Sequence, residues 1–150
     1  APTEIYPLSL HDALPISAQR RTILTTFHAL LEPSGSVLLD VYSLTAFSER
    51  EERAVYGPNL LDGFWSPGRY YGFLNTFKYE REKVVLDKYT IIEAERTRTI
   101  YNWLQYFSTE NLEREFTACG LAVEAYYSDV AGTPFSARSR EFAVIARKLQ

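Results

Sequence analysis

The sequence predicts an α/β fold that carries an inserted antiparallel β-meander. A segment with helical periodicity ends at a Pro-Ser-Gly turn and leads into an apolar strand, within residues 18–42. Three segments with period-two alternation follow between residues 70 and 107. A second capped helix and two more strands then complete the chain, so helices and strands share one domain.

The composition is that of one globular domain. The chain has 150 residues, 46% hydrophobic and 23% charged, which is enough for a single core. A net charge of −3 gives no electrostatic reason to expect nucleic acid or an anionic membrane as partner. No apolar run approaches the roughly 20 residues that span a bilayer. The single cysteine, Cys119, fits a reducing compartment, so we expect a cytoplasmic protein.

Residues 1–17, APTEIYPLSLHDALPIS, fit no element period and hold three of the seven prolines. They lack the basic start and sustained apolar region of a signal peptide. They resemble a translated sequencing-adapter segment, from which Pro7 departs, and the chain contains no methionine. We therefore expect residues 1–17 to be a non-native leader and Ala1 not to be the biological start. On this interpretation His11 and Asp12 have no catalytic or metal-binding role.

Residues 18–31 are predicted to form a helix with Ser17 as a possible N-cap. Pro33 and Gly35 end it. His28 lies beside the apolar stripe and is better explained as a boundary residue than as a ligand. The stripe itself consists of Ile23, Leu24, Phe27, Leu30 and Leu31.

Residues 37–42 are predicted to form a strand. Its apolar residues do not alternate with polar ones, as in a strand that is covered on both faces. Ligands of open α/β sheets bind beyond the carboxyl ends of the strands, which places Asp40 and Tyr42 near a ligand. Asp40 could equally be a turn or capping residue.

Residues 44–68 are predicted to be mixed in structure. Ser43 or Thr45 could cap a short helix that runs to Arg53, and the Gly-Pro-Asn sequence at 57–59 then breaks it. The Gly/Pro-rich loop at 62–68 carries two large aromatic residues that need an apolar surface. This pattern indicates a lid or a packing flap.

The meander is predicted as strands over residues 70–79, 84–92 and 97–105. Arg96 and Arg98 are expected on a solvated strand face rather than in an anion site. One face of the first strand is expected to bury its residues against the main body. These residues are Tyr71, Phe73, Asn75, Phe77 and Tyr79.

Residues 108–119 are predicted to form the second helix. Ser108 or Thr109 caps it, Glu110 complements its N-terminal dipole, and Gly120 ends it. Leu112, Phe116 and Cys119 form its buried stripe, so Cys119 is expected in the core rather than as a nucleophile. Strands are predicted at 121–127 and 141–147.

Three segments, in this order, resemble the C-terminal half of class I S-adenosylmethionine-dependent methyltransferases: LLEPSGSVLLD (30–40), YFSTENLEREFTACGL (106–121) and EFAVIARK (141–148). Ser34 replaces a glycine of the family's turn, Glu32 replaces its lysine, and Cys119-Gly120-Leu121 stands for its Ala-Gly-Phe. The resemblance covers residues 18–150. It implies part of a Rossmann-like sheet, with the meander inserted as a cap over about residues 56–107.

The resemblance also implies S-adenosylmethionine as the cofactor and a small molecule as the substrate. The family binds the cofactor through a glycine-rich turn after its first strand, and no such motif occurs in this sequence. No cofactor-binding residue is therefore assigned. We expect this chain to be part of a methyltransferase domain and to be inactive alone.

Methyl transfer requires alignment of the substrate and exclusion of water more than catalytic side chains. No catalytic residue is assigned, and the sequence shows no Cys/His metal cluster or Ser-His-Asp signature. The candidates for lining a substrate pocket are Tyr42, Phe64, Trp65, Tyr71, Asn75, Tyr101 and Trp103. Ordinary core packing is the alternative role for each aromatic residue.

A non-catalytic ligand-binding or dimerisation module built on the aromatic meander is the alternative function. A homo-oligomer could form through the cap or through an exposed sheet edge beside the strand at 37–42.

Overall fold

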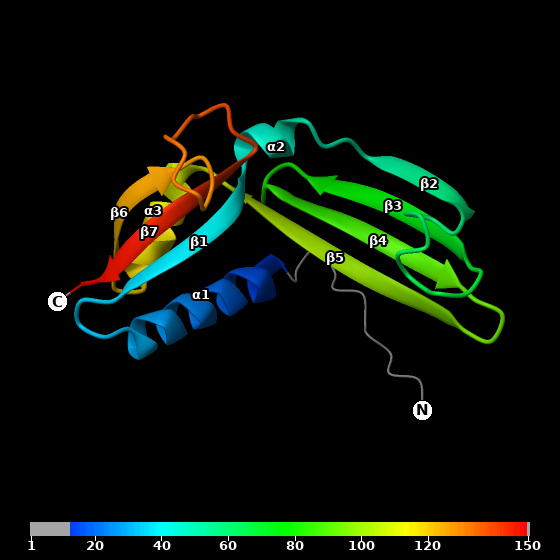
Figure 1. Ribbon diagram of the computed structural model, residues 1–150, viewed down its shortest axis with the longest axis horizontal. Coiled ribbons are helices and arrows are strands. Elements are labelled where there is room, and N and C mark those ends of the chain that lie inside the picture. The colour runs from blue at the N-terminus through cyan, green and yellow to red at the C-terminus, as the bar shows by residue number, and fades with distance from the viewer. Residues whose placement is uncertain (1–12, 150) are drawn as a thin grey trace. The chain divides into compact units, whose positions relative to one another are not determined.

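The structure is a computed structural model that describes residues 13–149 (Figure 1). Its strands follow the hydrogen-bonded order β2-β3-β4-β5-β1-β7-β6. The described chain divides into a first unit (residues 13–40, 108–136 and 142–149) and a second unit (residues 41–107 and 137–141). The elements are α1 (Ala13–Leu30), β1 (Ser36–Ser43), α2 (Leu44–Ser48), β2 (Arg53–Pro58), β3 (Tyr71–Tyr79), β4 (Val84–Ile92), β5 (Thr97–Phe107), α3 (Thr109–Ala118), β6 (Leu121–Tyr127) and β7 (Glu141–Lys148).

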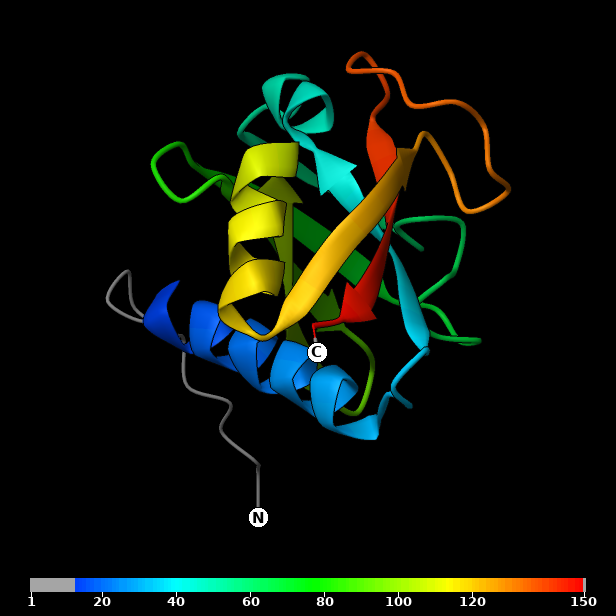
Figure 2. The same cartoon turned by 90° about the vertical axis from the view of Figure 1, so that its left-hand side faces the viewer.

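The first unit packs α1 and α3 beside β6 and β7 (Figure 2). Strands β6 and β7 pair antiparallel. Apolar residues from both helices and both strands are buried, which gives this unit a core of its own. Its buried members include Leu24, Leu112, Phe116, Leu121, Phe142 and Val144.

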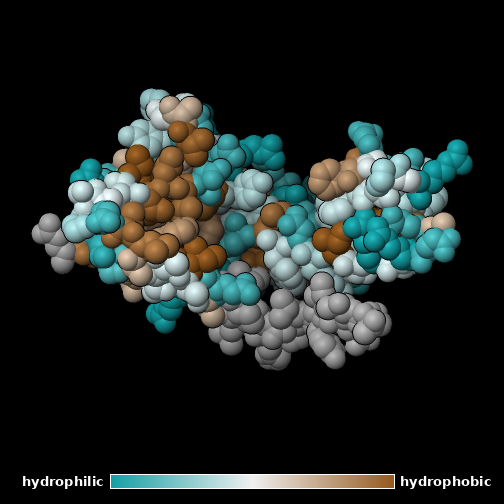
Figure 3. Space-filling model, turned by 60° about the horizontal axis from the view of Figure 1, so that its bottom comes forward, coloured by the Kyte–Doolittle hydropathy of each residue, from teal (hydrophilic) through white to brown (hydrophobic). Residues whose placement is uncertain are grey.

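Helix α1 differs from its prediction at the start and in its stripe. It begins at Ala13, so Ser17 lies inside the helix and is not its N-cap. Leu24 is buried, but Ile23 and Leu30 are 51% and 77% exposed. Hydrophobic side chains gather on the face of the first unit that Figure 3 shows. The first twelve residues of the expected leader lie outside the described residues, and the remaining five lie in α1.

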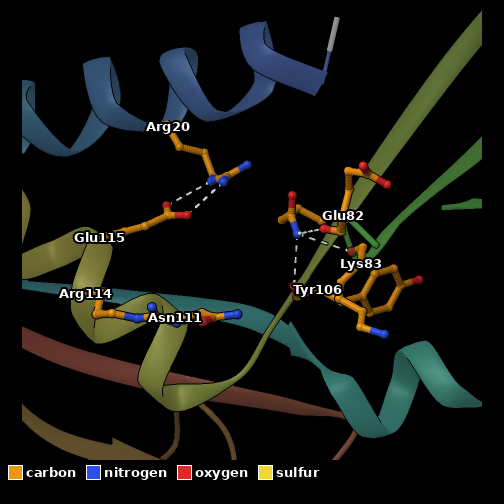
Figure 4. A network of polar contacts seen from close by, with 8 residues as sticks. Arg20, Glu82, Lys83, Tyr106, Asn111, Arg114 and Glu115 are labelled. Atoms are coloured by element: carbon orange, nitrogen blue, oxygen red, sulfur yellow. Dashed lines mark hydrogen bonds and ion pairs between the residues drawn. The ribbon is translucent and has the colours of Figure 1, made fainter. Parts of the chain in front are cut away.

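Polar contacts join α1 to its neighbours in the first unit. The Arg20 guanidinium donates two hydrogen bonds to the Glu115 carboxylate, at 2.9 and 2.7 Å (Figure 4). The Lys148 ammonium donates to the carbonyl of Leu31. Both partners of the ion pair are partly exposed, so it contributes little free energy and mainly orients the two helices.

Helix α3 forms as predicted. The Ser108 hydroxyl accepts a hydrogen bond from the Asn111 amide, and Glu110 lies in the first turn. The pKa of Glu110 is lowered, first by its own backbone amide and then by Ser108. Leu112, Phe116 and Cys119 are all buried, so Cys119 is a core residue.

Gly120 ends α3 in the left-handed conformation, at φ +76°. A Cβ placed on this glycine would lie 2.9 Å from the ring of His28. His28 therefore packs against the end of α3, which agrees with its interpretation as a boundary residue.

In the second unit, four strands form an antiparallel sheet in the order β2-β3-β4-β5. The predicted meander had three strands, and β2 was missed. Its residues were predicted to belong to a helix end and a loop because charged residues precede them. All six are exposed or half-exposed, as expected of an edge strand, and Pro58 is tolerated at its end.

Helix α2 is shorter than predicted and ends at Ser48. Ser43, one of the two proposed caps, accepts a hydrogen bond from the Ala46 amide and donates one to the carbonyl of Ser139. Ala46 and Phe47 of α2 pack with Val85 and Tyr106 of the sheet. The Phe47 and Tyr106 rings meet edge-on at 5.4 Å.

A buried carboxylate lies on the same side of the sheet as α2. Asp87 is 5% exposed. Its two oxygens accept 2.6 Å hydrogen bonds, one from the Arg50 guanidinium and one from the Thr76 hydroxyl. Arg50 lies two residues beyond the end of α2, so this ion pair joins the chain just after the short helix to the sheet.

We expect Asp87→Ala to lower the free energy of unfolding by about 2–3 kcal/mol, because it leaves Arg50 and Thr76 without their acceptor in a mostly buried site. Glu80→Ala removes an exposed carboxylate that also has ion-pair partners, and should change stability by less than about 0.5 kcal/mol. Urea unfolding of the three proteins measures both values. Equal values for the two variants would contradict a structural role for Asp87.

We expect Gly120→Ala to destabilise the protein by about 2 kcal/mol. Roughly half of this comes from the left-handed backbone and the rest from displacement of the His28 ring. Gly132 has φ +93° with open space around it, so Gly132→Ala isolates the backbone cost of about 1 kcal/mol. Adding His28→Ala should remove the clash from Gly120→Ala. Thermal unfolding of the three variants and the unchanged protein tests this, and identical losses at both glycines would rule out the contact with His28.

Candidate functional site

The sheet of the second unit has two unlike faces. The face towards α2, here named the covered face, holds Gly72, Leu74 and Thr76 of β3, all buried. The opposite face, here named the aromatic face, holds Tyr71, where the exposed fraction is 45%, and Phe77, where it is 42%. The cross-strand register assigns the following residues of β2 to β5 to the aromatic face: Ala54, Tyr56, Pro58, Tyr71, Phe73, Asn75, Phe77, Tyr79, Val84, Leu86, Lys88, Thr90, Ile92, Thr97, Thr99, Tyr101, Trp103, Gln105 and Phe107.

The predicted alternation of β3 is therefore present, but within this unit the opposite set of side chains is the buried one. Leu74 and Thr76 are buried, whereas the aromatic positions of β3 are exposed or half-exposed. Gly72 allows Leu60 to approach so closely that a Cβ on the glycine would lie 2.6 Å from it. On the covered face of β3, small and aliphatic residues, rather than aromatic rings, fit against α2 and the loop that carries Leu60.

Aromatic rings lie beside one another along the aromatic face. Tyr56 stacks on Phe73 at 5.8 Å, and Phe73 contacts Tyr71 at 6.0 Å. Tyr79 and Trp103 meet at 5.7 Å. Such rings offer flat surfaces on which a planar or ring-shaped ligand can stack.

A polar row crosses the middle of the aromatic face. Asn75 is the Cα partner of Lys88, and Lys88 is the Cα partner of Tyr101. The Lys88 ammonium lies 5.8 Å from the centre of the Tyr101 ring. Phe73 flanks this row on one side, and Phe77 and Trp103 flank it on the other.

The structure brings four of the seven predicted pocket residues onto the aromatic face: Tyr71, Asn75, Tyr101 and Trp103. Their role in binding remains a prediction. Lys88 was not among the candidates, although the alternation of residues 84–92 would have grouped it with Val84 and Leu86.

Phe64 and Trp65 are not part of this group. Trp65 packs at 4.7 Å on Tyr89, a residue of the covered face, and Phe64 is 74% exposed with its ring edge-on to Trp65. The buried Tyr70 fixes the loop, because its hydroxyl donates to the carbonyl of Leu60. The contact with Tyr89 shows that the loop packs on the sheet, as in the packing-flap prediction.

Arg98 corrects a further prediction. Its side chain is only partly exposed, at 34%, and the guanidinium donates to the carbonyl of Trp65. It therefore holds the loop on the covered face instead of lying on a solvated one. Arg96 is exposed, as predicted, and pairs with Glu93 in the adjacent turn.

Tyr42 lies near the end of β1, where its Cα partner on the parallel strand β5 is Tyr106. The two rings are 5.6 Å apart, and Tyr42 is 47% exposed. Asp40 is exposed within β1, so it is neither a turn residue nor a cap. Leu38, Asp40 and Tyr42 are exposed in alternation, which shows that β1 is not covered on both faces as predicted.

A cleft of about 490 Å³ opens at one end of the sheet in the second unit. Three of its lining residues, Pro58, Tyr71 and Ile92, belong to the aromatic face, so the cleft continues that face. The remaining lining residues are Asn59, Arg69, Tyr70 and Glu93.

Three tyrosines near these surfaces have raised pKa values. Burial, followed by the charge of Glu52, raises the pKa of Tyr79 on the aromatic face. Burial is also the main cause that raises the pKa of Tyr89 and Tyr106 on the covered face. The shifts move ionisation of these three phenols further above neutral pH.

The described residues offer stacking and hydrogen-bonding surfaces rather than a metal centre. No group of three or more His, Cys, Asp or Glu residues among them could hold a metal ion. None of the helices in the described part of the chain combines the length and apolar character needed to cross a membrane.

Two of the described glycines have no room for a nucleotide cofactor beside them. The determined N-caps of α2 and α3 are Ser43 and Ser108, and no glycine stands at either. Gly72 and Gly120 are closed off by the side chains of Leu60 and His28. Neither of these two positions fits S-adenosylmethionine.

Solved methyltransferases share this fold. The CcbJ methyltransferase from Streptomyces caelestis matches with a TM-score of 0.62 and 15% identity, over 89% of this chain and 51% of that one. An S-adenosylmethionine-dependent methyltransferase from Clostridium acetobutylicum matches with a TM-score of 0.66 and 8% identity, over 95% and 56%. The sugar N-methyltransferase KedS8 from a Streptoalloteichus species matches with a TM-score of 0.54 and 15% identity, over 89% and 50%.

These matches confirm the predicted fold class, a partial Rossmann-like methyltransferase sheet with an antiparallel insertion. The chain spans about half the length of the structures that it matches. No protein-family model matches the sequence, and no curated protein sequence matches it.

Proposed function

We propose that this chain forms the substrate-facing part of an S-adenosylmethionine-dependent methyltransferase that acts on a small molecule. The observation that carries the proposal is the fold match at TM-scores above 0.6 to two methyltransferases. The aromatic face supports it, because that face combines stacking surfaces with a central polar row.

In this proposal the chain positions the substrate. When bound, S-adenosylmethionine supplies a methyl group that is already electrophilic. Alignment of the substrate and exclusion of water therefore account for most of the catalysis. Tyr101 and Trp103 stack against the substrate, and Asn75 offers amide hydrogen bonds. Tyr71 lines the adjoining cleft. Tyr42 belongs to the proposed pocket by its place near the end of β1.

We further propose that cofactor binding requires polypeptide beyond residues 18–150, and that the chain is inactive alone. The half-length match to the solved methyltransferases supports this division. The exposed Leu30 and Leu38 of the first unit give further chain an apolar surface on which to pack. Residues 1–17 remain, in this proposal, a non-native leader.

The single buried Cys119 supports the cytoplasm as the place of action. The net charge of −3 and the aromatic face support a small-molecule partner rather than nucleic acid or a membrane.

Calorimetric titration tests whether cofactor binding requires polypeptide beyond residues 18–150. We expect no saturable heat when S-adenosylmethionine is titrated into the 150-residue chain, because its sequence has no glycine-rich cofactor motif. A protein that joins residues 18–150 to the natively encoded upstream sequence should bind the cofactor in the micromolar range. Micromolar binding by the 150 residues alone would contradict the proposal that cofactor binding requires further polypeptide. Absence of binding by the extended protein would contradict the proposal that the protein is a methyltransferase.

The aromatic face also favours a second function, a non-catalytic dimerisation module. Tyr56, Tyr71 and Phe77 expose 69%, 45% and 42% of their surface, enough to nucleate an apolar interface. A dimer that is stable and unfolds cooperatively without cofactor would support this alternative. Light scattering and concentration-dependent unfolding of the chain distinguish the two.

A further inference from the structure

Lys88 is the only charged residue that strands β2 to β5 place on the aromatic face. Every other position there is apolar, aromatic or an uncharged polar residue. The charged residues of the same strands lie on the covered face, where Asp87 is paired with Arg50. The aromatic face therefore has a single positive charge near its centre.

No carboxylate of the described residues pairs with this ammonium. Its one contact there is with the ring of Tyr101, at 5.8 Å. Lys88 is half-buried in the middle of β4, with its ammonium near a ring instead of a carboxylate. A cation next to an apolar surface interacts more strongly with an anion than a fully solvated lysine does.

The neighbours of Lys88 can complete a binding site for an organic anion. Asn75 and Tyr101 are its Cα partners on the two adjacent strands, and their amide and hydroxyl groups are of the kind that can hydrogen-bond to an anion. Phe73, Phe77 and Trp103 flank this polar row and can stack on a ring that carries the anion.

We propose that the aromatic face binds a ring-bearing organic acid, with Lys88 as the counter-ion of its carboxylate or phosphate and with Asn75 and Tyr101 as hydrogen-bonding partners. This inference rests on the proposed function, since it names the chemical class of the methyl acceptor. Lys88 is a specificity-determining residue: it selects an acidic ligand over its neutral isostere and fixes the orientation of the ring.

The experiment measures binding of three probes to the full chain without cofactor: 1-naphthoate, 1-naphthyl phosphate and the neutral 1-naphthamide. We expect at least one anion to bind about tenfold more tightly than the amide, and this preference to weaken with added salt. Preference for the carboxylate or for the phosphate identifies which anion the face takes. Equal affinity for all three probes overturns the proposal.

Variants assign the preference to Lys88. Lys88→Gln should lower affinity for the preferred anion about tenfold and leave that for 1-naphthamide unchanged, whereas Lys88→Arg should stay within about threefold of the original. Arg96→Gln removes one positive charge from an exposed turn and serves as the matched control, expected to have no effect. An equal loss in Arg96→Gln, or no loss in Lys88→Gln, contradicts the assignment.

The binding test gives a clear result even if Lys88→Gln does not fold or the protein is not an enzyme. If Lys88→Gln unfolds the protein, as circular dichroism would show, the comparison of anion with amide in the unchanged chain still decides the proposal. Because no cofactor is present, loss of the anion preference and failure of methyl transfer are separate results. If the extended protein binds the anion but transfers no methyl group, the result would support the proposed anion site and contradict the proposed methyltransferase function.

Discussion

The strict alternation of side chains across β2 to β5 is the constraint on which the second unit depends. In an antiparallel sheet, a shift of register by one residue would exchange the two faces of a strand. Here that shift would move Asp87 to the aromatic face and Lys88 to the covered face. Asp87 is held by Arg50 and Thr76 on the covered face, so the shift would break a buried ion pair and a hydrogen bond together. The polar core thus specifies which face carries the rings.

The same constraint explains the success and the error of prediction for the meander. Period-two patterns located β4 at the residues observed and β3 to within one residue. They could not tell which face is covered, because this depends on α2 and on the loop that holds Trp65. Aromatic residues usually mark the core, but here Leu74 and the small Gly72 fill it. The burial of Thr76 with Asp87 has no signature in local sequence.

Local signals identified the N-caps of α2 and α3 and the end of α3, but not the start of α1 or the end of α2. Ser43 and Ser108 cap their helices, and Gly120 adopts a left-handed conformation, because each depends on a few neighbouring residues. Contacts between distant segments were beyond the sequence. The packing of His28 on Gly120 and the hydrogen bond from Arg98 to Trp65 require the folded chain. The edge strand β2 was missed because its side chains are mostly exposed and show no clear alternation.

The candidate site shows why a single charge can matter on a face made of rings. Stacking fixes the plane of a flat ligand but leaves it free to rotate within that plane, because dispersion is non-directional. One charged contact with two hydrogen-bonding neighbours removes that freedom, and orientation is what methyl transfer asks of the protein. The rings around the polar row can therefore supply shape while the lysine supplies direction.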